Sequence, residues 1–92
     1  MNKNELLPKL DEWIDEQKYQ EYSDNTLKQY RANVLKFINW LPNNEPITKQ
    51  TTMDYKKYLY ELNPRPATSS INTWIIELNK FLKYVELNDL TI

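Results

Sequence analysis

Apolar residues recur at three- and four-residue steps through residues 23–41, the spacing that places side chains on one face of an α-helix. Ser23 can cap the unpaired N–H groups of a helix start, and Asp24 suits the positive end of the helix dipole. The apolar face consists of Leu27, Tyr30, Val34, Phe37, Ile38 and Leu41. The opposite face is polar and nearly free of acids, and consists of Asn25, Gln29, Ala32, Asn33 and Lys36. The pattern predicts an amphipathic helix whose polar face is open to contact.

Three further segments have helical spacing, and prolines bound the loops between the later ones. Residues 5–19 form the first segment, in which Leu6, Leu10, Trp13, Ile14 and Gln17 share one side. The third begins at Ile47 with Thr48, Thr51 and Thr52 as possible caps, continues with Tyr55, Tyr58, Leu59 and Leu62, and ends at residues 63–66. The fourth, residues 67–84, is the longest. No useful stretch has the period of two that strands show, so the sequence predicts an all-α bundle of four helices in one domain, residues 1–92.

The fourth segment also has two distinct faces. Its predicted core stripe consists of Ile71, Trp74, Ile75, Leu78, Phe81, Leu82 and Val85. Its far stripe consists of Ser69, Asn72, Thr73, Ile76, Lys80 and Lys83. Ile76 is the exception there, because it is apolar where solvent is expected; a single exposed Ile is ordinary and gives only modest support for an interface.

Composition excludes several kinds of site. The chain of 92 residues has no Cys, His or Gly, which excludes disulfides, thiolate zinc sites, Ser-His-Asp or Cys-His nucleophiles and glycine-rich phosphate loops. We expect no metal, cofactor or small-molecule ligand and no catalysis by this chain. It has no apolar run of the roughly 18 residues that a membrane span needs and no secretory signal, so we expect a soluble cytoplasmic protein.

The net charge of −1 hides an asymmetry along the chain. Residues 1–25 contain three Lys and seven acids, a net charge of −4, whereas residues 26–92 contain nine basic and six acidic residues, a net charge of +3. The acidic side of the first segment indicates a solvated surface, because several carboxylates without a pocket do not make a catalytic pair.

The starts of the second and fourth segments are rich in Ser, Thr and Asn. Such groups suit phosphate oxygens at a helix N-terminus, and the amides along these helices suit adenine edges in a major groove. They are also ordinary helix caps, and spacing alone favours that simpler interpretation.

A set of ordered motifs extends over residues 5–88. It reads Ser23-x-x-Thr26-Leu27-x-x-Tyr30-Arg31-x-x-Val34-x-x-Phe37, then Ile47-Thr48 before Asp54-Tyr55-x-x-Tyr58-Leu59-x-x-Leu62, then Ser70-Ile71-Asn72 with Leu78 and Phe81. The set resembles the N-terminal core-binding (SAM-like) domain of tyrosine recombinases and phage integrases. The resemblance implies a four-helix orthogonal bundle that precedes a catalytic domain, with the two domains clamping opposite sides of a DNA duplex.

The resemblance also implies that the second and fourth helices face the DNA. Carried over by position, the contacts are Asn25, Thr26, Lys28, Gln29 and Asn33 in the second helix and Ser69, Ser70 and Thr73 in the fourth. We add Asn72 and Lys80 because they lie near the contacts in the fourth helix, and Lys36 because it lies on the polar face of the second. The chain departs from the family pattern at Thr73 and Trp74, where Arg or Lys is frequent, and at Ser70, where Thr is frequent.

The family's catalysis uses Arg, His, Lys and a nucleophilic Tyr in the domain that follows. This chain has no His, and its tyrosines fall largely on apolar stripes or at helix ends, so we expect a fragment whose catalytic domain lies beyond residue 92. The expected partners are double-stranded DNA at a recombination core site and other recombinase protomers, with no membrane. Richness in Asn, Lys, Ile and Tyr is typical of AT-rich bacterial or phage genomes. The alternative is a helical protein–protein interaction domain that binds no DNA.

Overall fold

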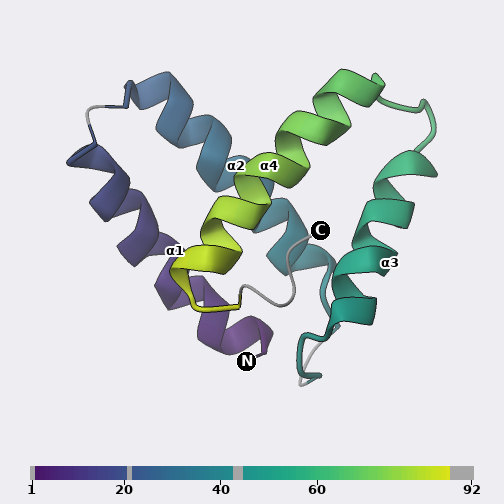
Figure 1. The fold of residues 1–92 in the computed structure, drawn as a ribbon, viewed down its shortest axis with the longest axis horizontal. Coiled ribbons are helices and arrows are strands. Elements are labelled where there is room, and N and C mark those ends of the chain that lie inside the picture. The colour runs from purple at the N-terminus through teal and green to yellow at the C-terminus, as the bar shows by residue number, and fades with distance from the viewer. Residues whose placement is uncertain (1, 21, 43–44, 88–92) are drawn as a thin grey trace. The chain divides into compact units, whose positions relative to one another are not determined.

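The computed structural model describes residues 2–20, 22–42 and 45–87, and these ranges contain four helices and no strand. The helices are α1 (Lys3–Lys18), α2 (Asp24–Trp40), α3 (Lys49–Tyr60) and α4 (Thr68–Tyr84) (Figure 1). The predicted all-α class and the four helical segments are confirmed. The chain groups into two compact units, Met1–Pro46 and Ile47–Ile92, each built from two helices. That residues 1–92 act as one domain stays a prediction.

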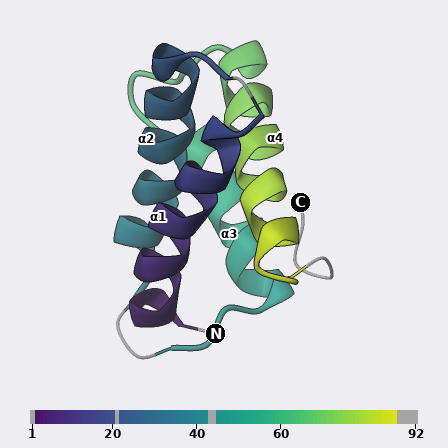
Figure 2. The same cartoon turned by 90° about the vertical axis from the view of Figure 1, so that its left-hand side faces the viewer.

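In the first unit, α1 and α2 form a helical hairpin, and both views show α2 returning alongside α1 (Figure 1; Figure 2). The ring of Trp13 stacks on that of Tyr30, with centroids 5.6 Å apart and planes 15° apart, and Tyr22 meets Tyr30 edge-on at 5.5 Å. Arg31 forms an ion pair with Asp11 at the surface of the same hairpin. Aromatic packing therefore joins the two helices inside, and an ion pair joins them outside.

The ends of α2 follow the predicted signals. The Ser23 hydroxyl oxygen accepts a hydrogen bond from the backbone N–H of Thr26 at 3.2 Å, and Asp24 lies in the first turn. The helix ends at Trp40 because Leu41, which precedes Pro42, has the extended backbone (φ −61°, ψ 141°) that a following proline favours. All six residues of the predicted apolar face are buried.

The first helix starts earlier than predicted. Asn2 caps it, since its side-chain oxygen accepts from the N–H groups of Asn4 and Glu5 at 3.1 and 3.3 Å, so that α1 begins at Lys3 instead of residue 5. Of its predicted apolar side, Ile14 and Gln17 are only half-buried, whereas the other three members are buried.

In the second unit, Thr48 and Thr51 form a reciprocal cap at the start of α3. The N–H of Thr51 donates to the Thr48 hydroxyl oxygen at 3.3 Å, and the N–H of Thr48 donates to the Thr51 hydroxyl oxygen at 3.1 Å. Thr52 is not a cap: it is fully buried, and its hydroxyl donates to the Lys49 carbonyl at 2.9 Å. The helix ends at Tyr60, before the predicted stop at residues 63–66.

Tyr55 and Tyr58 pack together on α3, with ring centroids 6.0 Å apart. Burial of Tyr55 raises the pKa of its phenol well above the ordinary value, and the nearby Tyr58 raises it further. Tyr55 therefore stays neutral even at moderately alkaline pH, as suits a buried side chain.

The fourth helix differs from its predicted core in two side chains. Trp74 is half-buried, and Glu77, which the apolar pattern did not include, is only 5% exposed. The other six members of the predicted stripe are buried. No side-chain cap bonds the first turn, since the N-cap residue is Ala67.

Within the described residues, no helix is long and apolar enough to cross a membrane.

Phe37 and Phe81 are both fully buried, one in each unit. Replacing either by Ala removes a large apolar side chain and leaves a cavity, so we expect the free energy of unfolding to fall by roughly 3–5 kcal/mol. Because small domains are stable by only about 5–15 kcal/mol, either variant can lose its cooperative thermal transition in circular dichroism. Tyr19→Ala is the control, since Tyr19 is 87% exposed; equal losses in all three variants contradict the assigned cores.

Candidate nucleic-acid interface

The polar face of α2 is exposed along most of its length. Asn25, Lys28 and Gln29 are exposed, whereas Thr26, Asn33 and Lys36 are half-buried. The helix contains one acid, Asp24, and that residue lies in the first turn. Beyond this turn, the face offers amides and two ammonium groups with no carboxylate in the same helix, which suits a polyanion.

Thr26 and Arg31 of α2 contact other polar groups of the first unit. The hydroxyl oxygens of Thr26 and Ser23 lie 2.9 Å apart, so Thr26 belongs to the helix cap as well as to the predicted contacts. The third cation of α2, Arg31, pairs with Asp11 of α1 and is thereby partly neutralised. The other two basic residues of the helix are Lys28, which is exposed, and Lys36, which is half-buried.

The far face of α4 has the same character. Ser69, Asn72, Thr73, Ile76, Lys80 and Lys83 are all exposed, and Ser70 is half-buried at the edge. The single acid of this helix is Glu77, and it is buried. The exposed surface of α4 therefore carries hydroxyls, an amide and two ammonium groups without a carboxylate of its own. The Thr73 hydroxyl donates to the Ser69 carbonyl at 3.0 Å, which leaves its oxygen to accept from a ligand.

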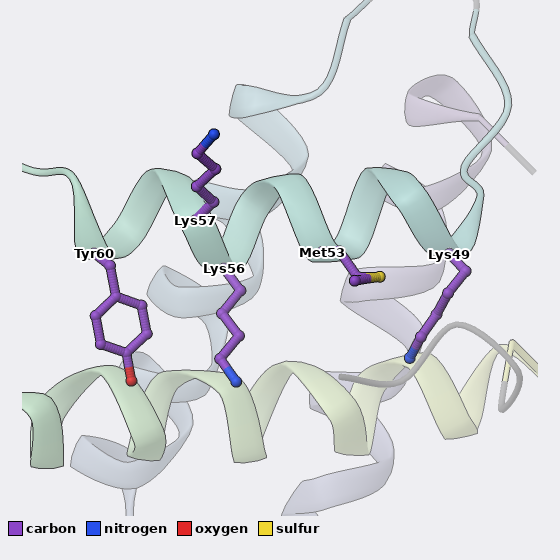
Figure 3. A pocket seen from close by; sticks show the side chains of 5 residues that line it. All are labelled: Lys49, Met53, Lys56, Lys57 and Tyr60. Carbon is purple, nitrogen blue, oxygen red and sulfur yellow. The ribbon is translucent and has the colours of Figure 1, made fainter.

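The third helix carries a basic surface that the sequence-based prediction missed. A shallow hollow of about 420 Å³ is lined by Lys49, Met53, Lys56, Lys57 and Tyr60. Figure 3 shows four of these side chains projecting from one side of α3 and Lys57 projecting from the other. Met53 is 52% exposed, and the Arg65 guanidinium lies 5.1 Å from the centre of the Tyr60 ring. Steps of four, three and four residues from Lys49 to Tyr60 are the signal that could have revealed this surface.

A family model described as "Phage integrase, N-terminal SAM-like domain" matches residues 10–88. The chain belongs to this family. Comparisons with curated proteins and with solved structures gave no significant match. As a member, the chain corresponds to the non-catalytic, N-terminal SAM-like part of phage integrases, and the resemblance of its ordered motifs to that domain is confirmed.

The match extends over both compact units of the integrase domain and includes every residue predicted to contact DNA. Those residues lie on α2 and α4, each helix in its own unit. That they bind DNA stays a prediction. Ser70, Thr26 and Asn33 are the least accessible of them. In the part of the integrase domain that the structure describes, no group of three or more metal-ligating side chains is placed to hold an ion.

Proposed function

We propose that this integrase domain binds double-stranded DNA at a recombination core site and positions it for a catalytic domain that cleaves and rejoins the strands. The observation that carries the proposal is the exposed face of α4, which has no carboxylate because the helix's single acid is buried. The corresponding face of α2 supports it, since its single acid is confined to the first turn. Membership of the phage integrase family implies a DNA partner for the domain in general.

The proposed contacts on the two faces fall into three chemical groups: ammonium groups, hydroxyls and amides. Lys28, Lys36 and Lys80 provide the positive charge for phosphates, and Ser69 and Ser70 provide hydroxyls at the start of a helix, where phosphate is favoured. The amides of Asn25, Gln29, Asn33 and Asn72 suit the hydrogen-bonding edge of adenine in the major groove. Thr26 and Thr73 complete the proposed contacts through the hydroxyl oxygens already described.

The rest of the proposal concerns the protein to which the domain belongs. Residues 1–92 act as one core-binding domain, a catalytic domain follows residue 92, and other recombinase protomers bind beside it on the DNA. This assembly works in the cytoplasm. Chemistry belongs to the following domain, and the present chain contributes affinity, position and part of the sequence readout.

Binding can be mapped by titrating isotope-labelled protein with a short A·T-rich duplex at low salt and following the backbone amide signals by NMR. We expect shifts in residues 25–36 and 69–80, because the proposed contacts lie there. If these amides stay unshifted while others move, the proposed surface is wrong.

One amide of α2 has a matched control elsewhere in the chain. Gln29→Ala removes a proposed base contact at an exposed position, so we expect the affinity for the same duplex to fall by roughly 1 kcal/mol, about fivefold, while the protein stays folded. Gln20 is also exposed and lies outside the proposed faces. Gln20→Ala should therefore bind as the unchanged protein does, and equal losses in both variants contradict a specific role for Gln29.

The salt dependence reports how many phosphates the lysines neutralise. With about three such contacts, the logarithm of the binding constant should fall with the logarithm of salt concentration at a slope of roughly −2 to −3. Lys28→Gln should make the slope shallower by about 1. Lys9→Gln, on α1 and paired with Glu12 at 3.4 Å, should leave it unchanged. An identical slope in all three proteins counts against phosphate contact by Lys28.

A second candidate function rests on the hollow of α3. An exposed methionine between lysines suits an acidic partner with apolar side chains, and residues 1–25 of a second copy have that character, with a net charge of −4. In this alternative the chain is a protein–protein interaction domain that binds no DNA. Size-exclusion chromatography with light scattering distinguishes the two: self-association that Lys56→Glu abolishes, without any shift on adding DNA, favours the protein contact.

A further inference from the structure

Ile76 lies in the middle of the exposed face of α4 and is itself 57% exposed. Asn72 precedes it by four residues, Thr73 by three, and Lys80 follows it by four, so helical geometry makes all three its surface neighbours. All three neighbours are exposed and polar. Ile76 is thus an aliphatic group surrounded by an amide, a hydroxyl and an ammonium group.

These surroundings do not suit a protein–protein interface. The centre of such an interface is a contiguous apolar patch, often with aromatic residues. Among the described residues, the other exposed large apolar side chains are Leu7, Tyr19, Tyr22 and Met53, and none of them lies on α4. Ile76 therefore has no apolar neighbour on its own face with which to build a patch.

The same surroundings match the floor of a DNA major groove. Base pairs present hydrogen-bond donors and acceptors there, together with one apolar group, the C5-methyl of thymine. An aliphatic side chain set among amide and hydroxyl groups can cover that methyl, while its neighbours bond to the polar edges. Facing cytosine instead, it would leave the exocyclic amino group unpaired.

We infer that Ile76 reads thymine in the core site through contact with its C5-methyl group; the inference rests on the proposed DNA-binding function. Asn72 lies four residues away, about 6 Å along the helix, which corresponds to one or two base pairs of roughly 3.4 Å each. Asn72 therefore suits an adenine edge one or two base pairs from that thymine. Ile76 is a specificity residue, and the lysines of the same helix contribute affinity.

The test starts with a library of random-sequence duplexes. Duplexes bound by the 92-residue chain at low salt are recovered, sequenced and compared with those recovered by Ile76→Ala. The unchanged protein should enrich a motif with one fixed thymine, and Ile76→Ala should lose the preference at that position while retaining it elsewhere. Because Ile76 is exposed, the thermal unfolding of the variant should match that of the unchanged protein.

The methyl group itself is tested on the recovered motif by replacing the fixed thymidine with deoxyuridine, which removes only the C5-methyl. We expect this replacement to lower the affinity of the unchanged protein about threefold to fourfold. Ile76→Ala should bind the thymidine and deoxyuridine duplexes with equal affinity. Ile76→Val retains a branched aliphatic group and should keep most of the sensitivity.

The possible results separate the inference from the function on which it rests. If the unchanged protein enriches no motif and binds no duplex, the proposed DNA binding fails and the inference fails with it. If a motif is enriched but deoxyuridine has no effect, or affects both proteins equally, the thymine contact is overturned and DNA binding stands. If Ile76→Ala instead abolishes self-association and leaves the motif unchanged, the residue belongs to a protein contact, which also overturns the inference.

Discussion

Each helix of this chain buries one apolar stripe, and this burial fixes the rotation of the helix about its own axis. With 3.6 residues per turn, a stripe committed to the interior leaves the opposite stripe exposed. In α2 the interior stripe includes the fully buried Val34 and Phe37, so Gln29 is left outside. In α4 it includes Phe81 and Leu82, so Asn72 and Ile76 are left outside. The packing of the cores thus decides which side chains are available for recognition.

The distribution of carboxylates gives these exposed faces their character. The net charge of −1 suggests a poor partner for DNA, but the acids are concentrated in the first 25 residues. Several of those on α1 are engaged in ion pairs: Asp11 with Arg31, Glu12 with Lys9, and Asp15 with Lys18. The single acid of α4 is buried. A weakly acidic protein can therefore present helix faces of positive charge, because the local arrangement, and not the sum, sets the field that a polyanion meets.

The proposed recognition faces carry few lysines, which implies a modest electrostatic contribution to DNA binding, so the proposed readout depends more on groups that distinguish bases. Amides on both helices and the isolated Ile76 on α4 are of this kind. Weak binding by one module is adequate if another domain of the same protein binds the same duplex. The hollow of α3, with Met53 between lysines, lies outside these recognition faces and is better suited to a protein partner.

The pattern of residue types was sufficient for the helical class, the interior stripe of α2, the cap at Ser23 and the far face of α4, because these depend on periodicity and on local hydrogen bonding. The residues of the candidate interface followed from the same periodicity together with the family motifs. Side-chain partners could not be predicted from periodicity. The cap at Asn2, the buried Thr52 hydroxyl and the pairing of Arg31 with Asp11 depend on which groups meet in space. Glu77 is buried and Trp74 is partly exposed, which is the opposite of what a charged and an aromatic side chain lead one to expect. Periodicity assigns each residue to a face, whereas only tertiary packing decides how fully its neighbours cover it.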